Sequence, residues 1–365
     1  MTTKNQLIRP MKNFVLLFIS LFIFSCSQKQ DNQKETTQQR PTPYWQPQES
    51  GVTAGFRGLS AVSDDVAWAS GSAGTVIRTI DGGTTWENVS IPGTDTLQFR
   101  DIEAFDANTA IVLSAGLPAV IYKTTDGGQN WEQKYFSMAE GTFYDAMDFW
   151  NDMEGIAFGD AIDGRLLILK TSDGGETWNE LPFEQRPQAL DGQGGFAASG
   201  TCLRTVGENQ VYIGLGGQEA SLFYSFDKGE TWQKTITPMQ SGESTEGIFS
   251  IDFKNEMEGL MVGGDYRGDS LTKINAAYTT DGGKSWFPVM AGMKPNGYRS
   301  GVAVYDNNLV LAVGRESCDY YYDGDKAYTP MEGKYYAVSV SKTGKSAWAS
   351  GPGGAVAKLG FRYIE

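Results

Sequence analysis

The chain has 365 residues, with 44 acidic side chains, 30 basic side chains and no histidine. This acidic balance disfavours nucleic acid as a partner, because the phosphate backbone is bound mainly by Lys and Arg. Histidine bases and ligands are excluded and the cysteines form no CxxC pair, so the composition predicts no metal site and no cofactor.

Residues 1–25 are predicted to be an export signal, with basic residues before an apolar run from Phe14 to Phe24. That run is too short to cross a bilayer, which takes about 20 residues. The sequence Ile23-Phe24-Ser25-Cys26 resembles a bacterial lipobox, which implies cleavage before Cys26 and a lipid on that cysteine. We therefore expect an exported protein, anchored by lipid in the bacterial cell envelope at a periplasmic or outer surface. The alternative is an ordinary cleaved signal and a free secreted protein.

After Cys26, the stretch up to residue 43 contains no large apolar side chain and is rich in Gln, Lys and Thr, so residues 26–43 are predicted to be a disordered tether. From Tyr44 to Glu365, glycine and aromatic residues are spread evenly with no second linker, and we expect one domain and a monomer. Loss of the signal removes three basic residues and no acidic one, which leaves 27 basic against 44 acidic residues and a net charge of −17.

A turn that ends in tryptophan occurs five times, with an aspartate at its third position. The aspartates lie between 45 and 54 residues apart, which is the period of four-stranded propeller blades and not of a helical solenoid. Period-two runs of apolar residues between the turns indicate antiparallel strands. The aspartates and the tryptophans of the five turns are Asp81 and Trp86, Asp126 and Trp131, Asp173 and Trp178, Asp227 and Trp232, and Asp281 and Trp286.

Two degenerate copies are expected to complete the ring. Residues 321–328 keep the aspartate and the first glycine, which indicates a sixth blade; a calcium loop is the alternative, but the ligand spacing and closing Glu of such a loop are absent. The last segment has only three strands, and residues 44–47 resemble the missing fourth, with Trp45 in the place of Trp86. The sequence thus predicts an all-β fold, a seven-bladed propeller in residues 44–365 whose last blade is closed by the N-terminal strand.

Each repeated turn has a structural role in this interpretation. A carboxylate at the third position can accept hydrogen bonds from the backbone N–H groups of the tight turn. The fifth position is Gly in all five copies, whereas the fourth is Lys228 in one, so we expect a positive φ at the fifth position, which Asp325 fills in the degenerate copy. The tryptophan is predicted to pack beside the adjacent sheet. Ligand binding is then expected elsewhere.

These turns match the Asp-box, or bacterial neuraminidase repeat, whose pattern is Ser/Thr-x-Asp-x-Gly-x-Thr/Ser-Trp. Over about 320 residues the chain resembles propellers related to photosystem II assembly and stability factors, which implies a non-catalytic binding or assembly platform. Sialidases also carry Asp-boxes, so a glycoside hydrolase of that type, or a glycan-binding protein, is the alternative. Proteins that resemble this chain are sometimes labelled oxidoreductases, but the sequence has no dinucleotide fingerprint, haem motif or thiol pair to support that activity.

Propeller connectivity places the second-to-third strand loops and the blade crossings on the face opposite the Asp-box turns, and we expect the ligand there. Three first strands begin with an aromatic residue and an arginine, and arginine forks suit carboxylates and phosphates. The expected ligand is a protein partner, an anionic small molecule or a glycan. The candidate arginines are Arg57, Arg100 and Arg299.

Each arginine has a structural alternative, in which it pairs with Asp101, Asp145 or Glu103. Charged loops of blades three, five and six add candidates, although solvated loop tips explain them equally well. These candidates are Asp160, Asp163, Arg165, Asp265, Tyr266, Arg267, Arg315 and Glu316. Cys202 and Cys318 fall in blades that are not neighbours, so we expect no disulfide between them.

Overall fold

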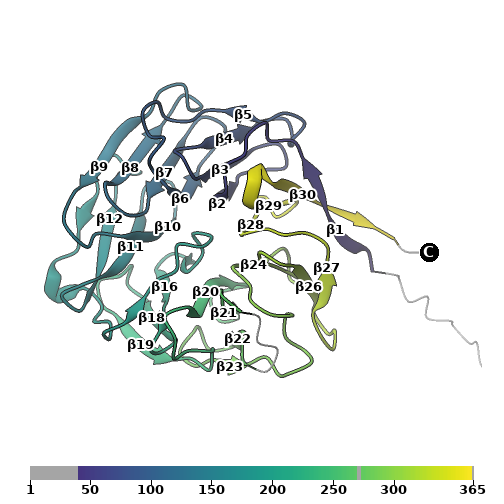
Figure 1. Ribbon diagram of the computed structural model, residues 1–365. Helices are drawn as coiled ribbons and strands as arrows, with labels where there is room; N and C mark the ends of the chain where they lie inside the picture. The colour runs from purple at the N-terminus through teal and green to yellow at the C-terminus, as the bar shows by residue number, and fades with distance from the viewer. Residues whose placement is uncertain (1–39, 269–272, 364–365) are drawn as a thin grey trace, which may run out of the picture. The chain divides into compact units, whose positions relative to one another are not determined.

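The computed structural model describes residues 40–268 and 273–363, and these form seven β-sheets arranged as a ring, viewed along its axis in Figure 1. The seven-bladed propeller predicted from the repeats is confirmed. The predicted export signal, Cys26 and most of the tether lie outside the described residues. Within the described ranges, no helix is long and apolar enough to cross a bilayer. Cys202 and Cys318 are free, buried thiols in separate blades.

In each of the first four blades, four antiparallel strands follow one another from the channel to the rim. Second strands such as β7 (Ala110–Ser114) are buried at every residue because neighbouring sheets cover both faces, whereas short outer strands such as β5 (Glu87–Asn88) are exposed. The other strands are β2 (Phe56–Ala61), β3 (Ala67–Gly71) and β4 (Val76–Thr79) in blade one; β6 (Phe99–Ala104), β8 (Ala119–Thr124) and β9 (Glu132–Ser137) in blade two; β10 (Tyr144–Phe149), β11 (Gly155–Ile162), β12 (Arg165–Thr171) and β13 (Asn179–Glu180) in blade three; and β15 (Leu203–Val206), β16 (Gln210–Gly214), β18 (Ser221–Ser225) and β19 (Gln233–Ile236) in blade four.

Blade five differs from the prediction, because its sheet has six strands instead of four. Two short strands, β14 (Gln193–Gly194) and β17 (Gly216–Gly217), continue the sheet inward from β20 (Glu246–Phe253). This close approach requires glycine, since a Cβ on Gly216 would lie 2.3 Å from the carbonyl oxygen of Glu246. The remaining elements are β21 (Gly259–Asp265), β22 (Ala276–Thr279) and β23 (Phe287–Pro288) in blade five; β24 (Gly301–Val304), β25 (Leu309–Val313), β26 (Cys318–Tyr322) and β27 (Thr329–Met331) in blade six; β28 (Ala337–Val340), β29 (Ala347–Ser350), β30 (Val356–Arg362) and β1 (Thr42–Gln48) in blade seven; and the 3-10 turns η1 (Phe183–Gln185) and η2 (Pro352–Gly354).

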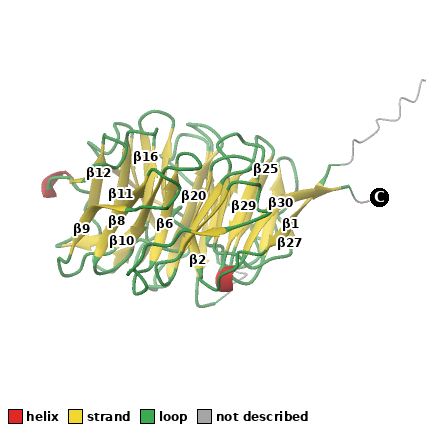
Figure 2. Cartoon of the chain, turned by 90° about the horizontal axis from the view of Figure 1, so that it is seen from above, coloured by secondary structure: helices red, strands yellow, loops and turns green. Residues whose placement is uncertain are grey.

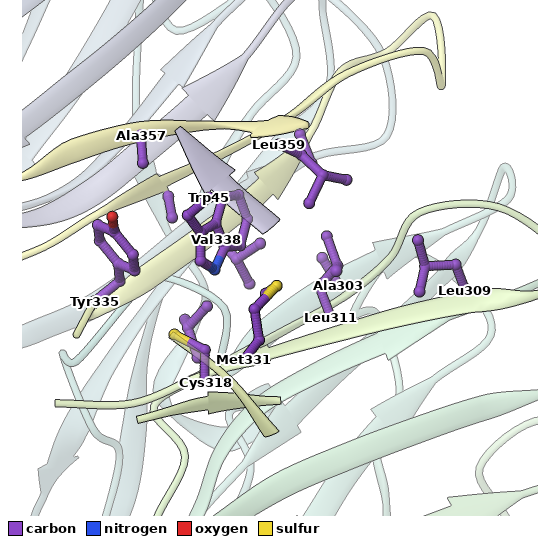
Figure 3. Close-up of a cluster of buried hydrophobic side chains, with 13 residues drawn as sticks. Trp45, Ala303, Leu309, Leu311, Cys318, Met331, Tyr335, Val338, Ala357 and Leu359 are labelled. Carbon is purple, nitrogen blue, oxygen red and sulfur yellow. The ribbon is translucent and has the colours of Figure 1, made fainter. Parts of the chain in front are cut away.

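The ring closes as predicted, through a strand from each end of the chain. The N-terminal strand β1 pairs with β30, with Trp45 opposite Leu359. Trp45 is 7% exposed and packs in a buried cluster with Cys318, Met331 and Tyr335 at the interface of blades six and seven (Figure 3). Its ring meets that of Tyr335 edge-on, with the centroids 5.7 Å apart. Trp45 therefore fills the interface position that the Asp-box tryptophans fill between other blades.

The Asp-box turns have the predicted hydrogen bonds, with an added role for the first residue. Its hydroxyl accepts the N–H of the fifth-position glycine at 2.8–3.0 Å in all five copies. The aspartate accepts the backbone N–H of the seventh residue, for example that of Thr177 by Asp173 at 2.9 Å. The backbone φ is positive at the fourth position as well as the fifth, including +57° at Lys228.

The sixth turn is tighter than expected. Gly324 has a φ of +85°, but Asp325 lies outside the left-handed region, contrary to the expectation that it replaces the fifth-position glycine. The reason is a shorter turn, in which the N–H of Asp325 donates to the carbonyl oxygen of Tyr322 at 2.9 Å. Only one residue of such a turn needs a positive φ, and glycine supplies it.

The first strand of each blade turns one edge toward the channel, mostly without a further strand to pair with it. Side chains of the preceding blade bind the backbone N–H groups of that edge. Ser60 accepts the N–H of Ala104 at 3.0 Å, and Asp101 accepts that of Met147 at 2.7 Å. The same contact joins Asp148 to Thr205, Ser250 to Val302, Asp252 to Val304 and, where the ring closes, Ser339 to Ala61.

Truncating Trp45 tests the closure. We expect Trp45→Ala to lower the free energy of unfolding by about 3–5 kcal/mol, because it empties the interface between blades six and seven. Urea unfolding monitored by circular dichroism measures this change. The matched control Gln46→Ala, at an exposed neighbouring position, should cost less than about 0.5 kcal/mol. Equal effects of the two variants would show that the N-terminal strand does not close the ring.

The Asp-box aspartates should also make stability depend on acid pH. The hydroxyl of Thr177 outweighs partial burial and, with the Thr177 N–H, lowers the pKa of Asp173 from 3.8 to about 2. Because the folded pKa is the lower one, the stabilisation is present above about pH 4 and is lost as the pH falls toward about 2. We expect the urea midpoint of Asp173→Asn to fall less steeply over this range than that of the wild type. The variant Asp163→Asn, in an exposed turn outside the repeats, is the control and should keep the wild-type slope.

Candidate functional site

The first strands bring the predicted arginines toward one end of the channel, but only two of the three meet there. Arg57 on β2 and Arg100 on β6 line a pocket of about 210 Å³, together with Arg315 of blade six. We call this the mouth pocket. It lies where the first strands begin, on the face opposite the Asp-box turns, which is the face for which the sequence predicts a ligand.

Aromatic side chains form the walls of the mouth pocket. Phe196 stacks on Phe249 with the ring centroids 3.8 Å apart, and Tyr298 meets Phe249 edge-on at 4.8 Å. The guanidinium of Arg57 lies 4.4 Å from the ring centroid of Tyr336. Guanidinium groups next to π surfaces suit an apolar or aromatic group that carries a carboxylate. The aromatic residues of the pocket are Phe196, Phe249, Tyr266, Tyr298 and Tyr336.

Arg57 and Arg100 form no ion pair with a carboxylate among the described residues. Arg57 donates to the carbonyl oxygen of Ala198 at 3.2 Å, and Arg100 donates to that of Ala197 at 3.0 Å. Burial, and next the charge of Arg57, lower the pKa of Arg100 to about 10, so it stays charged at neutral pH. A guanidinium has five N–H donors, so one carbonyl leaves capacity for a ligand. The structural ion pairs considered as an alternative are not formed at these two positions.

Arg299 does not reach the mouth pocket, contrary to expectation. Its side chain is fully buried within blade six, where its Nε lies 2.7 Å from Oδ2 of Asp319. Its other donors bind the carbonyl oxygen of Tyr298 at 2.7 Å and the hydroxyl of Ser317 at 3.0 Å. The partner Asp319 lies on β26, so the arginine turns into its own sheet and away from the channel. The three predicted arginines therefore do not converge, and the third arginine of the mouth pocket is Arg315.

Two of the loop candidates, Tyr266 and Arg315, line the mouth pocket, whereas the others lie outside it. Asp160 accepts the N–H of Gly195 at 3.0 Å, and Arg165 donates to the carbonyl oxygen of Arg186 at 2.7 Å. The other candidates have local roles. Asp163 lies in a turn with a φ of +53°, and Asp265 accepts the N–H of Arg267, whose guanidinium lies over the ring of Tyr266. Glu316 forms ion pairs with Arg315 and Lys334. Asp269, the last residue of the charged loop in blade five, lies outside the described residues.

Sequence reasoning missed the segment that fills the channel, residues 194–201, which we call the plug. Besides its bonds to the two arginines, the plug donates from Ser199 to the carbonyl oxygen of Ser300 at 2.7 Å. Gly200 packs against Asp101, since a Cβ at this position would lie 2.2 Å from its Oδ1. The plug therefore separates the mouth pocket from the cavity behind it. The only signal in the sequence is a long stretch before blade four that lacks an alternating pattern.

Behind the plug, the channel widens toward the Asp-box face into a cavity of about 520 Å³. Its polar lining includes two ion pairs, Arg204 with Asp252 at 3.0 Å and Lys342 with Glu103 at 3.2 Å. Burial raises the pKa of Glu103, which the nearby Lys342 offsets only in part. The sequence directs attention to the opposite face, so this second polar cavity is an addition from the structure. Within the described ranges, no group of three or more acidic or cysteine side chains is placed to hold a metal ion.

Comparisons with known proteins identify the same Asp-box repeats. A family model of the photosynthesis system II assembly factor YCF48 matches residues 37–139, and a model of the BNR/Asp-box repeat matches residues 223–234. A search of curated protein sequences finds no match. The chain is an Asp-box propeller that resembles the photosystem II assembly factors.

Solved structures share the fold over most of the chain. A structure of YCF48 bound to D1 peptide has a TM-score of 0.63 and 17% identity, covering 88% of this chain and 95% of that one. The structure of YCF48 from Cyanidioschyzon merolae has a TM-score of 0.61 and 16% identity, covering 87% and 99%. A GH74 xyloglucanase from Xanthomonas campestris has a TM-score of 0.58 and 14% identity, covering 86% of this chain and 53% of the enzyme. At such identities the likeness establishes the fold alone.

The different environments of the arginines predict different costs of removal. We expect Arg299→Met to lower the free energy of unfolding by about 3–5 kcal/mol, because it leaves Asp319 buried without its partner. The double variant Arg299→Met/Asp319→Leu should recover most of this loss. Urea unfolding of the wild type and of both variants measures these free energies. Arg57→Met, at a half-buried position, is the matched control and should cost about 1 kcal/mol. Equal costs for the two single variants would contradict a structural role confined to Arg299.

Proposed function

We propose that this protein is a non-catalytic binding or assembly platform whose mouth pocket binds an acidic segment of a protein partner. The observation that carries the proposal is the pair Arg57 and Arg100, charged and without an ion-pair partner among the described residues, at the end of the channel. In a mature chain with a predicted net charge of −17, most surfaces repel anions. The mouth pocket is therefore a place where a carboxylate gains binding energy.

The size and lining of the pocket favour a peptide over a folded domain. A volume of about 210 Å³ accommodates one or two side chains or a chain end. The stacked pair Phe196 and Phe249 offers an apolar surface, and the arginines offer forked donors beside it. Carbonyl oxygens of the plug already bind both guanidinium groups, which indicates that peptide backbone fits at this site.

The structural relatives support a binding role. YCF48, which shares the fold, has been solved with D1 peptide bound. For the present chain, a protein partner at the propeller is a proposal that rests on this likeness together with the mouth pocket. Glycan hydrolysis of the sialidase type is less well supported, because Arg299 is bound to Asp319 and, among the described residues, no Asp or Glu lines the mouth pocket to act as an acid or base.

We further propose that the mature protein is held at a membrane of the cell envelope through lipid on Cys26. The support is the sequence alone, a short apolar run that ends at this cysteine and is followed by a polar tether. Such an anchor would keep the platform close to membrane-bound partners. Mass spectrometry of the protein purified from membranes tests the modification directly.

Removing Arg57 and Arg100 together tests the binding role. A peptide array that varies acidic and aromatic residues selects ligands, and calorimetry measures their affinity. We expect Arg57→Gln/Arg100→Gln to weaken binding about 100- to 10,000-fold, since each of the two lost charge-assisted hydrogen bonds contributes about 1.5–3 kcal/mol. The control Arg165→Gln/Lys334→Gln makes the same change of charge outside the mouth pocket and should bind as the wild type does.

Two outcomes would contradict the proposal. One is peptide binding that is as tight in Arg57→Gln/Arg100→Gln as in the control. The other is turnover of chromogenic glycosides, including sialosides, by the wild-type protein that is lost in the arginine variant, which would make the site that of a hydrolase.

A further inference from the structure

The two ends of the chain form a two-stranded ribbon that continues past the rest of blade seven. β29 pairs with β30 only from Val356 to Lys358, whereas β1 pairs with β30 as far as Arg362. The outer pairs, from Trp45 opposite Leu359 to Thr42 opposite Arg362, therefore have no third strand. Figure 1 and Figure 2 both show β1 and β30 leaving the rim of the ring side by side. We call these outer pairs, with Tyr363, the terminal ribbon.

The terminal ribbon exposes aromatic side chains at its outer end. Tyr363 is 70% exposed, the highest value among the large apolar side chains of the described residues, and Phe361 is 40% exposed. The ring of Tyr305, from blade six, lies 5.6 Å from that of Phe361 and extends the same surface. A two-stranded ribbon is at best marginally stable in water, and exposed aromatic rings add to the cost. This pattern is typical of a surface that has a partner.

The charge of the ribbon is opposite to that of the chain. The terminal ribbon, residues 42–45 and 359–363, contains one basic side chain, Arg362, and no acidic one, whereas the whole chain carries 44 acidic against 30 basic residues. The guanidinium of Arg362 lies 5.4 Å from the ring centroid of Tyr44. Tyrosine and arginine together are the composition that membrane–water interfaces favour, because the rings enter the headgroup layer while the charges meet lipid phosphates.

The proposed lipid would hold this ribbon near a bilayer. Fifteen peptide steps separate Cys26 from Pro41, the residue before β1. A flexible chain of that length has a root-mean-square span of about 20 Å, and even a fully extended one reaches only about 50 Å. The ribbon is the part of the propeller to which the tether is joined, so its effective concentration at the membrane is high.

We infer that the terminal ribbon contacts the lipid headgroup surface and stands the propeller on its rim. The inference rests on the proposed lipid anchor at Cys26. Since the ribbon leaves the ring at its rim, both ends of the channel then face along the membrane plane (Figure 2). The mouth pocket in this orientation is open to segments of neighbouring membrane proteins.

Hydrogen exchange on vesicles tests the contact. The mature protein is anchored in vesicles of phosphatidylethanolamine and phosphatidylglycerol, through its own lipid or, if Cys26 proves unmodified, through a maleimide lipid on that thiol. Cys202 and Cys318 are buried and do not compete for the coupling. We expect the backbone amides of the terminal ribbon to exchange at least about fivefold more slowly on vesicles than in solution. Exchange at the mouth pocket and on the opposite rim should change little.

The variant Phe361→Ser/Tyr363→Ser should lose this slowing, whereas Ile236→Ser, which removes a 68%-exposed side chain of β19, should keep it. Equal urea midpoints of the variants show that the fold is intact. Unchanged exchange in the ribbon of anchored protein would overturn the inference, as would slowing that appears only when membrane proteins are added. Because either route anchors the chain, an unmodified Cys26 would refute the proposed lipid without preventing a test of the ribbon.

Discussion

The inner edge of each first strand is the constraint on which the ring depends. Its backbone N–H groups face the channel, and one left without a partner would cost about 1–3 kcal/mol. Oxygens of the preceding blade remove that cost, as Asp101 does for Met147. Ser339 of blade seven extends this series across the ring closure, because it accepts the N–H of Ala61 in blade one. The strand that brings Trp45 to blade seven therefore stabilises contacts on both sides of the closure.

This use of carboxylates explains where the unpaired charge lies. Asp148 and Asp252 accept backbone N–H groups of the next blade and also flank Arg204, so these carboxylates of the channel wall already have partners. At the mouth the first strands carry Arg57 and Arg100 instead, and both guanidinium groups donate to carbonyl oxygens of the plug. Neither arginine forms an ion pair with a carboxylate among the described residues, which leaves their positive charge for a ligand.

The repeats predicted most of the fold because an Asp-box turn is a local structure. Its hydroxyl, carboxylate and glycine lie within five residues, so their spacing alone implies the hydrogen bonds that the structure contains. The same reasoning failed at Asp325, where a turn one residue shorter satisfies the backbone differently. It also failed for Arg299, since the choice between the channel and Asp319 depends on a strand that is distant in sequence.

The sequence by itself determined the number of blades, the closing role of Trp45 and the face on which Arg57 and Arg100 lie, because these follow from period, strand alternation and connectivity. Only the tertiary structure decided which arginines meet, what fills the channel and how far the terminal ribbon continues beyond its blade. Those features depend on contacts between segments far apart in the chain, such as the plug against Arg57 of β2 and Arg100 of β6. No local pattern encodes such contacts, because each residue pair is brought together only when the ring is complete.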